Sequence, residues 1–418
     1  MPSRRPSRRS AERPATTHAP VWGPDEVGLP PLDGVVPALA SFDRIGDASP
    51  LDIELRASEF LGHLGAGALA DPQPGEPDHE ELLNGLVEVC LHHLDAEPPR
   101  VVVDFCWVVD AFDPGYVQWP LHDRLLAADL PGSPAWLMAV GDASITGAWT
   151  VGHETGDGYD VVVTARHPGA ESDHVLAVYV DRTLGDLAKD LLVHSDAAKF
   201  LELAEEDTAM VVTEISPSTA AATIDVALDA TFEAGAIVPV SDTFASLFSI
   251  VEHYVAKLPT DGRPLARPPV STPEEQSSMI DAFLGSDAGA VHASDRDALA
   301  AAVAFVVDEV GGEADRWSPV VTHLVMAGWL PRAELEEPSL VRFGDLLRDF
   351  VPWVHRLRGW DDRYVADTLA IIDAVEGEVD EAQSGGRVEI LEQAVVAGVD
   401  LDDEAALDAF LDEYLEDS

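Results

Sequence analysis

The stretch ITGAWTVGHETGDGYDVVVTARHPGAESDHVLAVYV, residues 145–180, contains three runs rich in valine, threonine and aromatic residues. Asp157-Gly158 stands between the first two runs, and Pro168-Gly169 stands between the second and the third. Short β-branched runs that are separated by such turn pairs are typical of antiparallel hairpins. The stretch therefore predicts a small antiparallel β-meander, to which residues 210–215 (MVVTEI) can add a fourth strand.

The residues after the third run show a different spacing. Thr183 precedes apolar residues at i, i+3, i+4, i+7 and i+8, the pattern of one helix face: Leu184, Leu187, Ala188, Leu191 and Leu192. Asp186 follows Thr183 at the spacing of a capping box, and Lys189 can pair with Asp186. This pattern predicts a helix and places Asp181 at a strand–helix junction.

Helical patterns flank the meander. Ser49-Pro50 is a start signal for a helix that runs to about residue 64, and a second helix is expected over 80–93. Residues 101–109 form a continuous apolar run that fits either a buried strand or a buried helix. After the meander, Ser216-Pro217 opens a helix to about residue 232, and another is expected over 243–257.

The segment LPTDGRPLARPPVST, residues 258–272, contains four prolines and is the clearest linker in the chain. Beyond it, Thr272-Pro273-Glu274-Glu275 forms a capping box. Helices are expected over roughly 273–285, 295–310, 317–328, 339–357, 361–375 and 402–416. We therefore predict an α+β protein with a disordered Arg/Pro-rich tail (1–44), a helical and β-meander domain (45–257), the linker (258–272) and a helical domain (273–418).

The charge of the chain is extreme, with 77 acidic residues against 25 Lys and Arg and a formal net charge of −52. Such a field repels phosphate backbones and anionic lipid surfaces, which argues against nucleic-acid and membrane binding. The five arginines of residues 1–13 could bind nucleic acid only weakly against this negative charge. The acidity fits adaptation to a salty cytoplasm, and the lysine-poor composition equally fits a GC-rich coding sequence.

The two cysteines, Cys90 and Cys106, both lie in strongly apolar surroundings, which is the pattern of buried reduced thiols. The basic start MPSRRPSRRSAERP is not followed by the apolar run of a secretory signal, and no apolar run is long enough to span a bilayer. We therefore expect a cytoplasmic protein.

Standard enzyme signatures are absent from the sequence, including phosphate-binding glycine loops, zinc-protease motifs and nucleophile elbows. His92, His93 and Asp95 suggest a metal site only superficially, because adjacent residues on a helix face different directions. The sequence therefore assigns no catalytic, cofactor-binding or metal-binding residue. Asp181 and Arg182 at the strand end are the one candidate position for a functional site, since strand ends can carry functional groups.

A Trp/Arg-rich region stands out between residues 317 and 363. It contains these residues: Trp317, Trp329, Arg332, Arg342, Arg348, Trp353, His355, Arg356, Arg358, Trp360 and Arg363. Arginine and tryptophan dominate the energetics of protein interfaces, which makes this region a candidate partner surface. The other interpretation is that the tryptophans belong to a helical core and that the arginines pair with the protein's own carboxylates.

Three segments resemble an uncharacterised family of proteins from high-GC actinobacteria. They are SPLDIELRASEFLGHL, HVLAVYVDRTLGDLAKDLLV and WSPVVTHLVMAGWLPR with the following HRLRGW, spread over about residues 45–375. The chain departs from the family pattern at Arg182, where the family often has His, and at Gly328, where it has Asp. No activity is established for the family, so the resemblance implies a shared fold and no chemistry.

Together these features predict a non-catalytic interaction or regulatory protein, with the Trp/Arg-rich region as its candidate partner surface. The alternative is an enzyme of unrecognised class with a site near Asp181. A cleft with converging polar groups beside Asp181 would favour the alternative.

Overall fold

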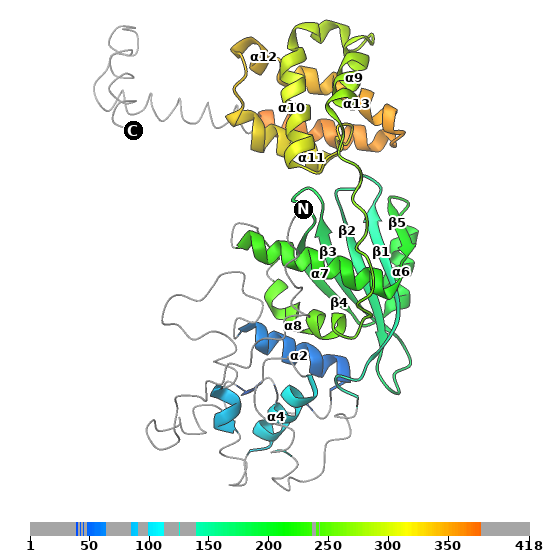
Figure 1. Ribbon diagram of the computed structural model, residues 1–418, viewed down its shortest axis with the longest axis vertical. Coiled ribbons are helices and arrows are strands. Elements are labelled where there is room, and N and C mark those ends of the chain that lie inside the picture. The colour runs from blue at the N-terminus through cyan, green and yellow to red at the C-terminus, as the bar shows by residue number, and fades with distance from the viewer. Residues whose placement is uncertain are drawn as a thin grey trace, which may run out of the picture. The chain divides into compact units, whose positions relative to one another are not determined.

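The computed structural model of the chain describes residues 48–63, 85–90, 99–112, 139–235 and 243–377, with positions 39, 40, 42, 45, 125, 240 and 241. The chain forms two compact units, Met1–Arg267 and Pro268–Ser418 (Figure 1). Most of the predicted tail (1–44) and the predicted helix at 402–416 lie outside the described residues. The predicted α+β class is confirmed, since the first unit combines a sheet with helices and the described part of the second is helical.

The sheet of the first unit has five antiparallel strands in the order β4-β3-β2-β1-β5. The strands are β1 (Ser144–His153), β2 (Gly158–Arg166), β3 (His174–Asp181), β4 (Leu187–His194) and β5 (Met210–Glu214). The three β-rich runs are β1 to β3, so the predicted meander is present. The candidate fourth strand is β5, and it pairs with β1 at the sheet edge.

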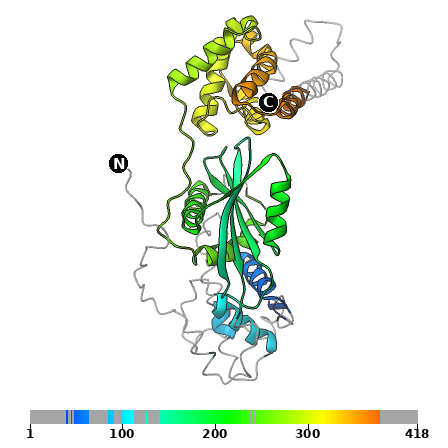
Figure 2. The same ribbon diagram turned by 90° about the vertical axis from the view of Figure 1, so that its right-hand side faces the viewer.

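Helices cover both faces of this sheet (Figure 2). On one face, α6 (Ala197–Glu206) packs over a small cluster that includes Val151, Val162 and Ala177. On the other face, α7 (Pro217–Ala234) packs over the main core, which contains alternate residues of the same strands such as Val161 and Val163. Strands β2 and β3, in the middle of the sheet, are therefore buried on both sides, which explains their continuous apolar sequences.

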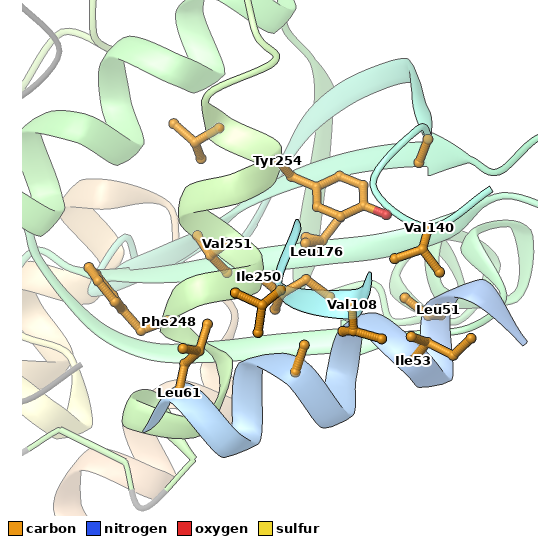
Figure 3. Close-up of a cluster of buried hydrophobic side chains, with 14 of the residues drawn as sticks. Leu51, Ile53, Leu61, Val108, Val140, Leu176, Phe248, Ile250, Val251 and Tyr254 are labelled. Atoms are coloured by element: carbon orange, nitrogen blue, oxygen red, sulfur yellow. The ribbon is translucent and has the colours of Figure 1, made fainter. Parts of the chain in front are cut away.

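The main core extends from the sheet to a pair of helices, α2 (Pro50–His63) and α8 (Phe244–Val255), that pack on each other. Figure 3 shows side chains of both helices in one cluster, among them Leu61 and Ile53 of α2 and Phe248 and Tyr254 of α8. Helix α4 (Arg100–Phe112) adds further buried apolar residues. The run 101–109, for which the sequence left two interpretations, is therefore helical, and residues 85–90 of the predicted helix 80–93 are helical too.

The predicted helix after β3 is wrong, because residues 187–194 form strand β4 of a hairpin. The register shifts so that Val180 pairs with Ala188 and Tyr179 with Asp190, which leaves Lys189 as an extra, bulged residue. A bulge breaks the two-residue alternation, so Ala188 and Leu191 lie on the same face although they are three residues apart. This three-residue spacing of apolar residues is the same as that on one face of a helix. Leu192 points to the other face and is 43% exposed.

The predicted linker (258–272) packs on the units at both of its ends. In the first unit Leu258 is buried, and the Leu265 amide donates a 3.0 Å hydrogen bond to Thr223 Oγ1. In the second unit the Ser271 amide donates to the Gly312 carbonyl at 2.7 Å. The division between the units, after Arg267, therefore falls inside the proline-rich segment, and only a short stretch of it lies between these two anchored parts.

The described part of the second unit, up to residue 377, is built from helices and short helical turns. They are α9 (Pro273–Leu284), η6 (Ala290–Asp295), α10 (Arg296–Glu309), α11 (Pro319–His323), η7 (Leu324–Trp329), η8 (Leu330–Arg332), α12 (Glu337–Val341), α13 (Phe343–Arg358) and a helix over 362–377. The predicted capping box is present at Thr272 and Glu275. The predicted helix 317–328 is divided, because the backbone widens to a π-helical turn at η7.

The core of the second unit is apolar and aromatic. Trp317 is fully buried and its ring meets Phe350 edge-on with centroids 5.0 Å apart. Phe283 packs edge-on against both Phe350 and Trp353. Within the described residues, no helix is long and apolar enough to cross a membrane.

Candidate functional site

The Asp181 carboxylate fixes the turn between β3 and β4. Its Oδ1 accepts hydrogen bonds from the Thr183 amide at 2.9 Å and from Thr183 Oγ1 at 2.6 Å. Its Oδ2 accepts from Lys189 Nζ at 3.3 Å. Asp181 is 6% exposed, so both oxygens are occupied and largely shielded from solvent. The predicted strand–helix junction is therefore a hairpin turn whose acid has a structural task, and Lys189 pairs with Asp181 in place of the predicted Asp186.

Two residues at the end of the same turn, Gly185 and Asp186, bind Arg267, the last residue of the first unit. Gly185 and Asp186 have φ values of 95° and 62°, a left-handed conformation that glycine and aspartate tolerate better than other residues. This conformation brings Asp186 into an ion pair with Arg267. Arg267 Nη2 also donates to the Gly185 carbonyl at 2.7 Å. The segment 265–267 is thereby held across the sheet beside the turn.

These contacts enclose a pocket of about 250 Å³ that lies entirely within the first unit. Its floor is formed by facing residues of the paired strands β1 and β5, with Thr150 opposite Thr213 and Gly152 opposite Val211. Residues of the β1–β2 turn, the β3–β4 turn and segment 265–267 form the walls. A cleft with polar groups does therefore lie next to Asp181, but Asp181 itself does not line it.

The charged side chains of this pocket are unusual for so acidic a chain. Arg182 and Arg267 line it together with a single acid, Asp186. Tyr159 also lines the pocket, and burial, followed by the nearby Asp186 charge, raises the pKa of its phenol to about 12. The phenol therefore stays protonated at neutral pH and can donate a hydrogen bond. This site, which we call the β5 pocket, presents hydrogen-bond donors and has two guanidinium groups and one carboxylate in its lining.

A second group of polar side chains, the Glu54 network, is buried in the core. Glu54 Oε1 accepts from His167 Nε2 at 2.9 Å and from the Gly141 amide at 2.8 Å. Glu54 Oε2 accepts from the Tyr254 hydroxyl at 2.6 Å, and that hydroxyl accepts from His174 Nε2 at 2.9 Å. The side chains of Glu54, His167, His174 and Tyr254 are all at least nine-tenths buried. The network thus joins α2, α8 and the β2–β3 connection.

Burial and hydrogen bonding shift the proton affinities of this network. Burial alone raises the pKa of Glu54, but the hydrogen bonds from His167, Tyr254 and Gly141 outweigh it and lower the pKa overall. Burial, reinforced by the neighbouring His167, lowers the pKa of His174 to about 4. Burial and the Glu54 charge raise the pKa of Tyr254. At neutral pH the network therefore contains a charged carboxylate and a neutral His174, an arrangement suited to holding elements together.

The Trp/Arg-rich region has mostly internal contacts. Trp317 is a core residue, and His355 Nε2 donates to its carbonyl oxygen at 2.7 Å. The arginines pair with carboxylates of the same unit: Arg342 with Asp295, Arg348 with Asp345, Asp373 and Glu376, and Arg358 with Glu313 and Asp315. Arg356 is exposed and, among the described residues, its side chain forms no ion pair. The exposed part of the region is thus smaller than its sequence indicates.

Other candidates from the sequence carry no chemistry in the described part of the chain. Cys90 and Cys106 are free and buried, as their apolar surroundings predict. His92, His93 and Asp95 lie outside the described residues. Among the residues that the structure does describe, no three His, Cys, Asp or Glu side chains gather in a metal-binding arrangement.

Sequence reasoning missed both the β5 pocket and the Glu54 network. One signal for the network was present, because Glu54 stands on the apolar face of α2 between Leu51 and Ser58, all of them buried. A carboxylate in such a stripe must find partners in the core. The pocket left no comparable signal, since it is assembled from segments that are far apart in the sequence.

Comparisons with protein-family models, with curated proteins and with solved structures found no match to this chain.

Proposed function

We propose that the chain is a non-catalytic binding protein whose first unit pairs with an extended segment of a partner protein along strand β5. The two edges of the sheet differ. At the β4 edge, the Lys189 carbonyl accepts from the Ser241 amide at 3.0 Å and the Ala188 carbonyl accepts from Thr231 Oγ1 at 2.9 Å. At the other edge, β5 pairs with β1 alone among the described residues.

The register of β5 identifies the backbone groups at the open edge. The Ile215 amide donates to the Ala148 carbonyl, and the Glu154 amide donates to the Ala209 carbonyl. Odd-numbered residues of β5 therefore face β1, and by alternation the amides of Val212 and Glu214 face outward. The neighbouring Val211 is 53% exposed. Open strand edges bind extended peptides through backbone hydrogen bonds, with specificity supplied by adjacent pockets, and the β5 pocket lies beside this edge.

The open edge of β5 is the observation that supports this function over catalysis. The alternative, an enzyme with a site at Asp181, has less support because both oxygens of that carboxylate are occupied by the turn. A general base needs to reach the proton that it removes. The net charge of −52 further disfavours nucleic acid as the partner.

The exposed end of helix α13 is a second candidate partner surface, as the Trp/Arg composition suggested. Arg356 and Leu357 are exposed there, Leu357 by 58%. This surface is small, because the other arginines of the region pair internally. We place the main interaction at β5 for that reason.

A displayed library of random twelve-residue peptides, selected on the immobilised full chain, tests the β5 proposal. Val212→Pro removes an outward amide without removing a hydrogen bond to β1, so selected peptides should lose about tenfold or more in affinity, the effect of one or more backbone hydrogen bonds. Val270→Pro is the matched control, since Val270 is 64% exposed and follows two prolines. Peptides that bind the Val212→Pro variant as tightly as the natural chain, or a selection that yields none, would contradict the proposal.

A further inference from the structure

The β5 pocket has a charge that runs against the rest of the chain. Overall, acidic residues outnumber Lys and Arg by 77 to 25. In the pocket lining this ratio is reversed, with Arg182 and Arg267 against Asp186. The lining thus contains two guanidinium groups and one carboxylate. A concave site of one sign concentrates the field of its charges and attracts a ligand of the opposite sign.

The hydrogen-bonding groups of the pocket are also arranged for an anion. Thr150 and Thr213 face each other across the β1–β5 pair, so their hydroxyls can donate from the floor. The Tyr159 phenol, protonated because its pKa is about 12, can donate from the wall. Arg267 uses part of its guanidinium for Asp186 and Gly185, yet its side chain is 63% exposed and a guanidinium carries five N–H donors. Hydroxyl and guanidinium donors are therefore available among the lining residues.

The size of the pocket limits the ligand. A volume of about 250 Å³ is below the roughly 300–1,000 Å³ of pockets that enclose drug-sized molecules. A Cβ at position 152 would lie 3.0 Å from Tyr159 Cβ, so a larger residue there would crowd Tyr159 in the lining. The space fits one side chain or one chain terminus. It does not fit a nucleotide.

We infer that the β5 pocket binds a single carboxylate of the partner segment that pairs with β5. The inference rests on the proposed function and names the chemistry that the site recognises. A guanidinium fork matches a carboxylate or a phosphate in geometry. The carboxylate is favoured, because a phosphate dianion would bring two negative charges into a strongly acidic protein and a carboxylate brings one.

The acidity of the remaining surface adds a condition on the partner. Unpaired charges at the protein surface act over about 8 Å at physiological ionic strength. A segment with several acids would therefore be repelled outside the pocket, whereas a segment with one acid among neutral or basic residues would not. The partner segment should carry one carboxylate at a fixed distance from the residues that pair with β5.

Peptides from the library selection described above, resynthesised singly, test this inference. Each is made in its parent form, with its acid replaced by the amide (Glu→Gln or Asp→Asn), with an amidated C-terminus, and with phosphoserine in place of the acid. Affinities are measured on the full natural chain, on Arg267→Gln, on Thr150→Val and on Arg263→Gln. Arg263 is the matched control, because it is exposed on the same extended segment and does not line the pocket.

The selected peptides should share one acid or a free C-terminus at a fixed position, and neutralising that group should weaken binding about tenfold or more. Arg267→Gln should cause a similar loss and Thr150→Val a smaller one, while Arg263→Gln should have no effect. The peptide forms distinguish a side-chain carboxylate from a terminal one. Tighter binding of the phosphoserine form would overturn the assignment to a carboxylate.

Peptides that depend on Val212 but show no preference for an acid, and that bind Arg267→Gln as well as the natural chain, would overturn this inference alone. Failure of the proposed function has a different outcome, because binding would then not depend on Val212. Thr150→Val keeps the β-branched shape of the residue, so it remains informative if Arg267→Gln disturbs the β3–β4 turn.

Discussion

The two units of this chain place their polar groups differently. In the first unit, side chains from several elements bond to one another inside the core, with Glu54, His167, His174 and Tyr254 at the centre. In the second unit, the core is aromatic, and two of its largest buried polar side chains bond to backbone carbonyls, His355 to Trp317 and Arg316 to Val310. Several of its charged pairs lie nearer the surface, whereas Asp295, which pairs with Arg342, is buried.

This difference predicts two kinds of stability. A buried carboxylate with three donors is sensitive to the loss of any partner and to protonation. An aromatic core with exposed ion pairs is sensitive to packing defects and tolerates the loss of single charges, because water and salt screen them. Substitutions of the Glu54 network in the first unit should therefore have large effects, and substitutions of the exposed ion pairs in the second unit should have small effects.

The largest effect is expected for Glu54→Leu. This change places an apolar side chain in the core and leaves His167, Tyr254 and the Gly141 amide without their acceptor. A buried donor without an acceptor costs about 1–3 kcal/mol, so the loss of all three contacts should lower the free energy of unfolding by about 3 kcal/mol or more. Amide hydrogen exchange, resolved by mass spectrometry to peptides of each unit, should show faster exchange in the first unit only.

Glu59→Leu on the same helix is the control, since Glu59 is exposed and the change should cost within about 0.5 kcal/mol. Equal losses of unfolding free energy for Glu54→Leu and Glu59→Leu would mean that the hydrogen bonds of the network do not stabilise the first unit. Faster exchange in both units would mean that the units do not unfold separately.

Two groups of the first unit should make its stability depend on pH in opposite directions. Burial and His167 hold the pKa of His174 near 4, below an unfolded value of about 6.5, so the unfolded chain binds more protons between these values. His174 therefore lowers the stability as pH falls through this window, by up to about 3 kcal/mol at about 1.4 kcal/mol per pKa unit. Burial and Asp190 raise the pKa of Asp160 to about 6, so Asp160 raises the stability as pH falls from about 6 to about 4.

The two contributions should largely cancel in the natural chain between pH 6 and pH 4. His174→Gln leaves Asp160 alone, so the first unit should become more stable as pH falls from 7 to 5, whereas Asp160→Asn should become less stable. Urea unfolding curves at pH 7, 6 and 5 measure this. If both variants follow the natural chain, these groups keep their ordinary proton affinities in the folded protein.

The elements that the sequence predicted correctly are those that local chemistry determines. Ser216 and Pro217 start α7, the Thr272 capping box starts α9, and a left-handed Gly359 ends α13, each as its residue type predicts. Strand β4 was mistaken for a helix because the bulge at Lys189 depends on pairing with β3, which no local pattern shows.

The candidate site was less accessible to sequence reasoning than the fold. The interpretation that the arginines pair with the protein's own carboxylates could be stated from the surplus of carboxylates. It holds for Arg342, Arg348 and Arg358, but their individual partners required the structure. The β5 pocket depends on a pairing between residues 150 and 213 and on a chain segment near residue 267. Contacts over such separations arise from tertiary packing and leave no periodicity in the sequence.

The smallest effects are expected for Arg356 and Arg358, two arginines at the end of α13. Comparing them distinguishes stabilisation by ion pairs and a ring contact from stabilisation by the helix dipole. Arg358 pairs with Asp315 at 2.7 Å and Glu313 at 3.2 Å and lies 5.1 Å from the centre of the Trp360 ring. Arg356 lies at the same helix end, where a cation stabilises the helix by about 0.3–1 kcal/mol through its interaction with the helix dipole.

Arg358→Ala should therefore cost about 1–2 kcal/mol, from its partly shielded ion pairs, its ring contact and the dipole, while Arg356→Ala should cost only the dipole contribution of about 0.3–1 kcal/mol. Urea unfolding of the two single variants and of the double variant, at 0.1 M and 1 M NaCl, separates these contributions. The cost of Arg358→Ala should shrink in high salt, because ion pairs are screened and apolar contacts are not.

Equal costs for the two variants would assign the stabilisation to the helix dipole alone. A double variant that folds normally but loses a binding partner would instead show that this helix end contacts that partner.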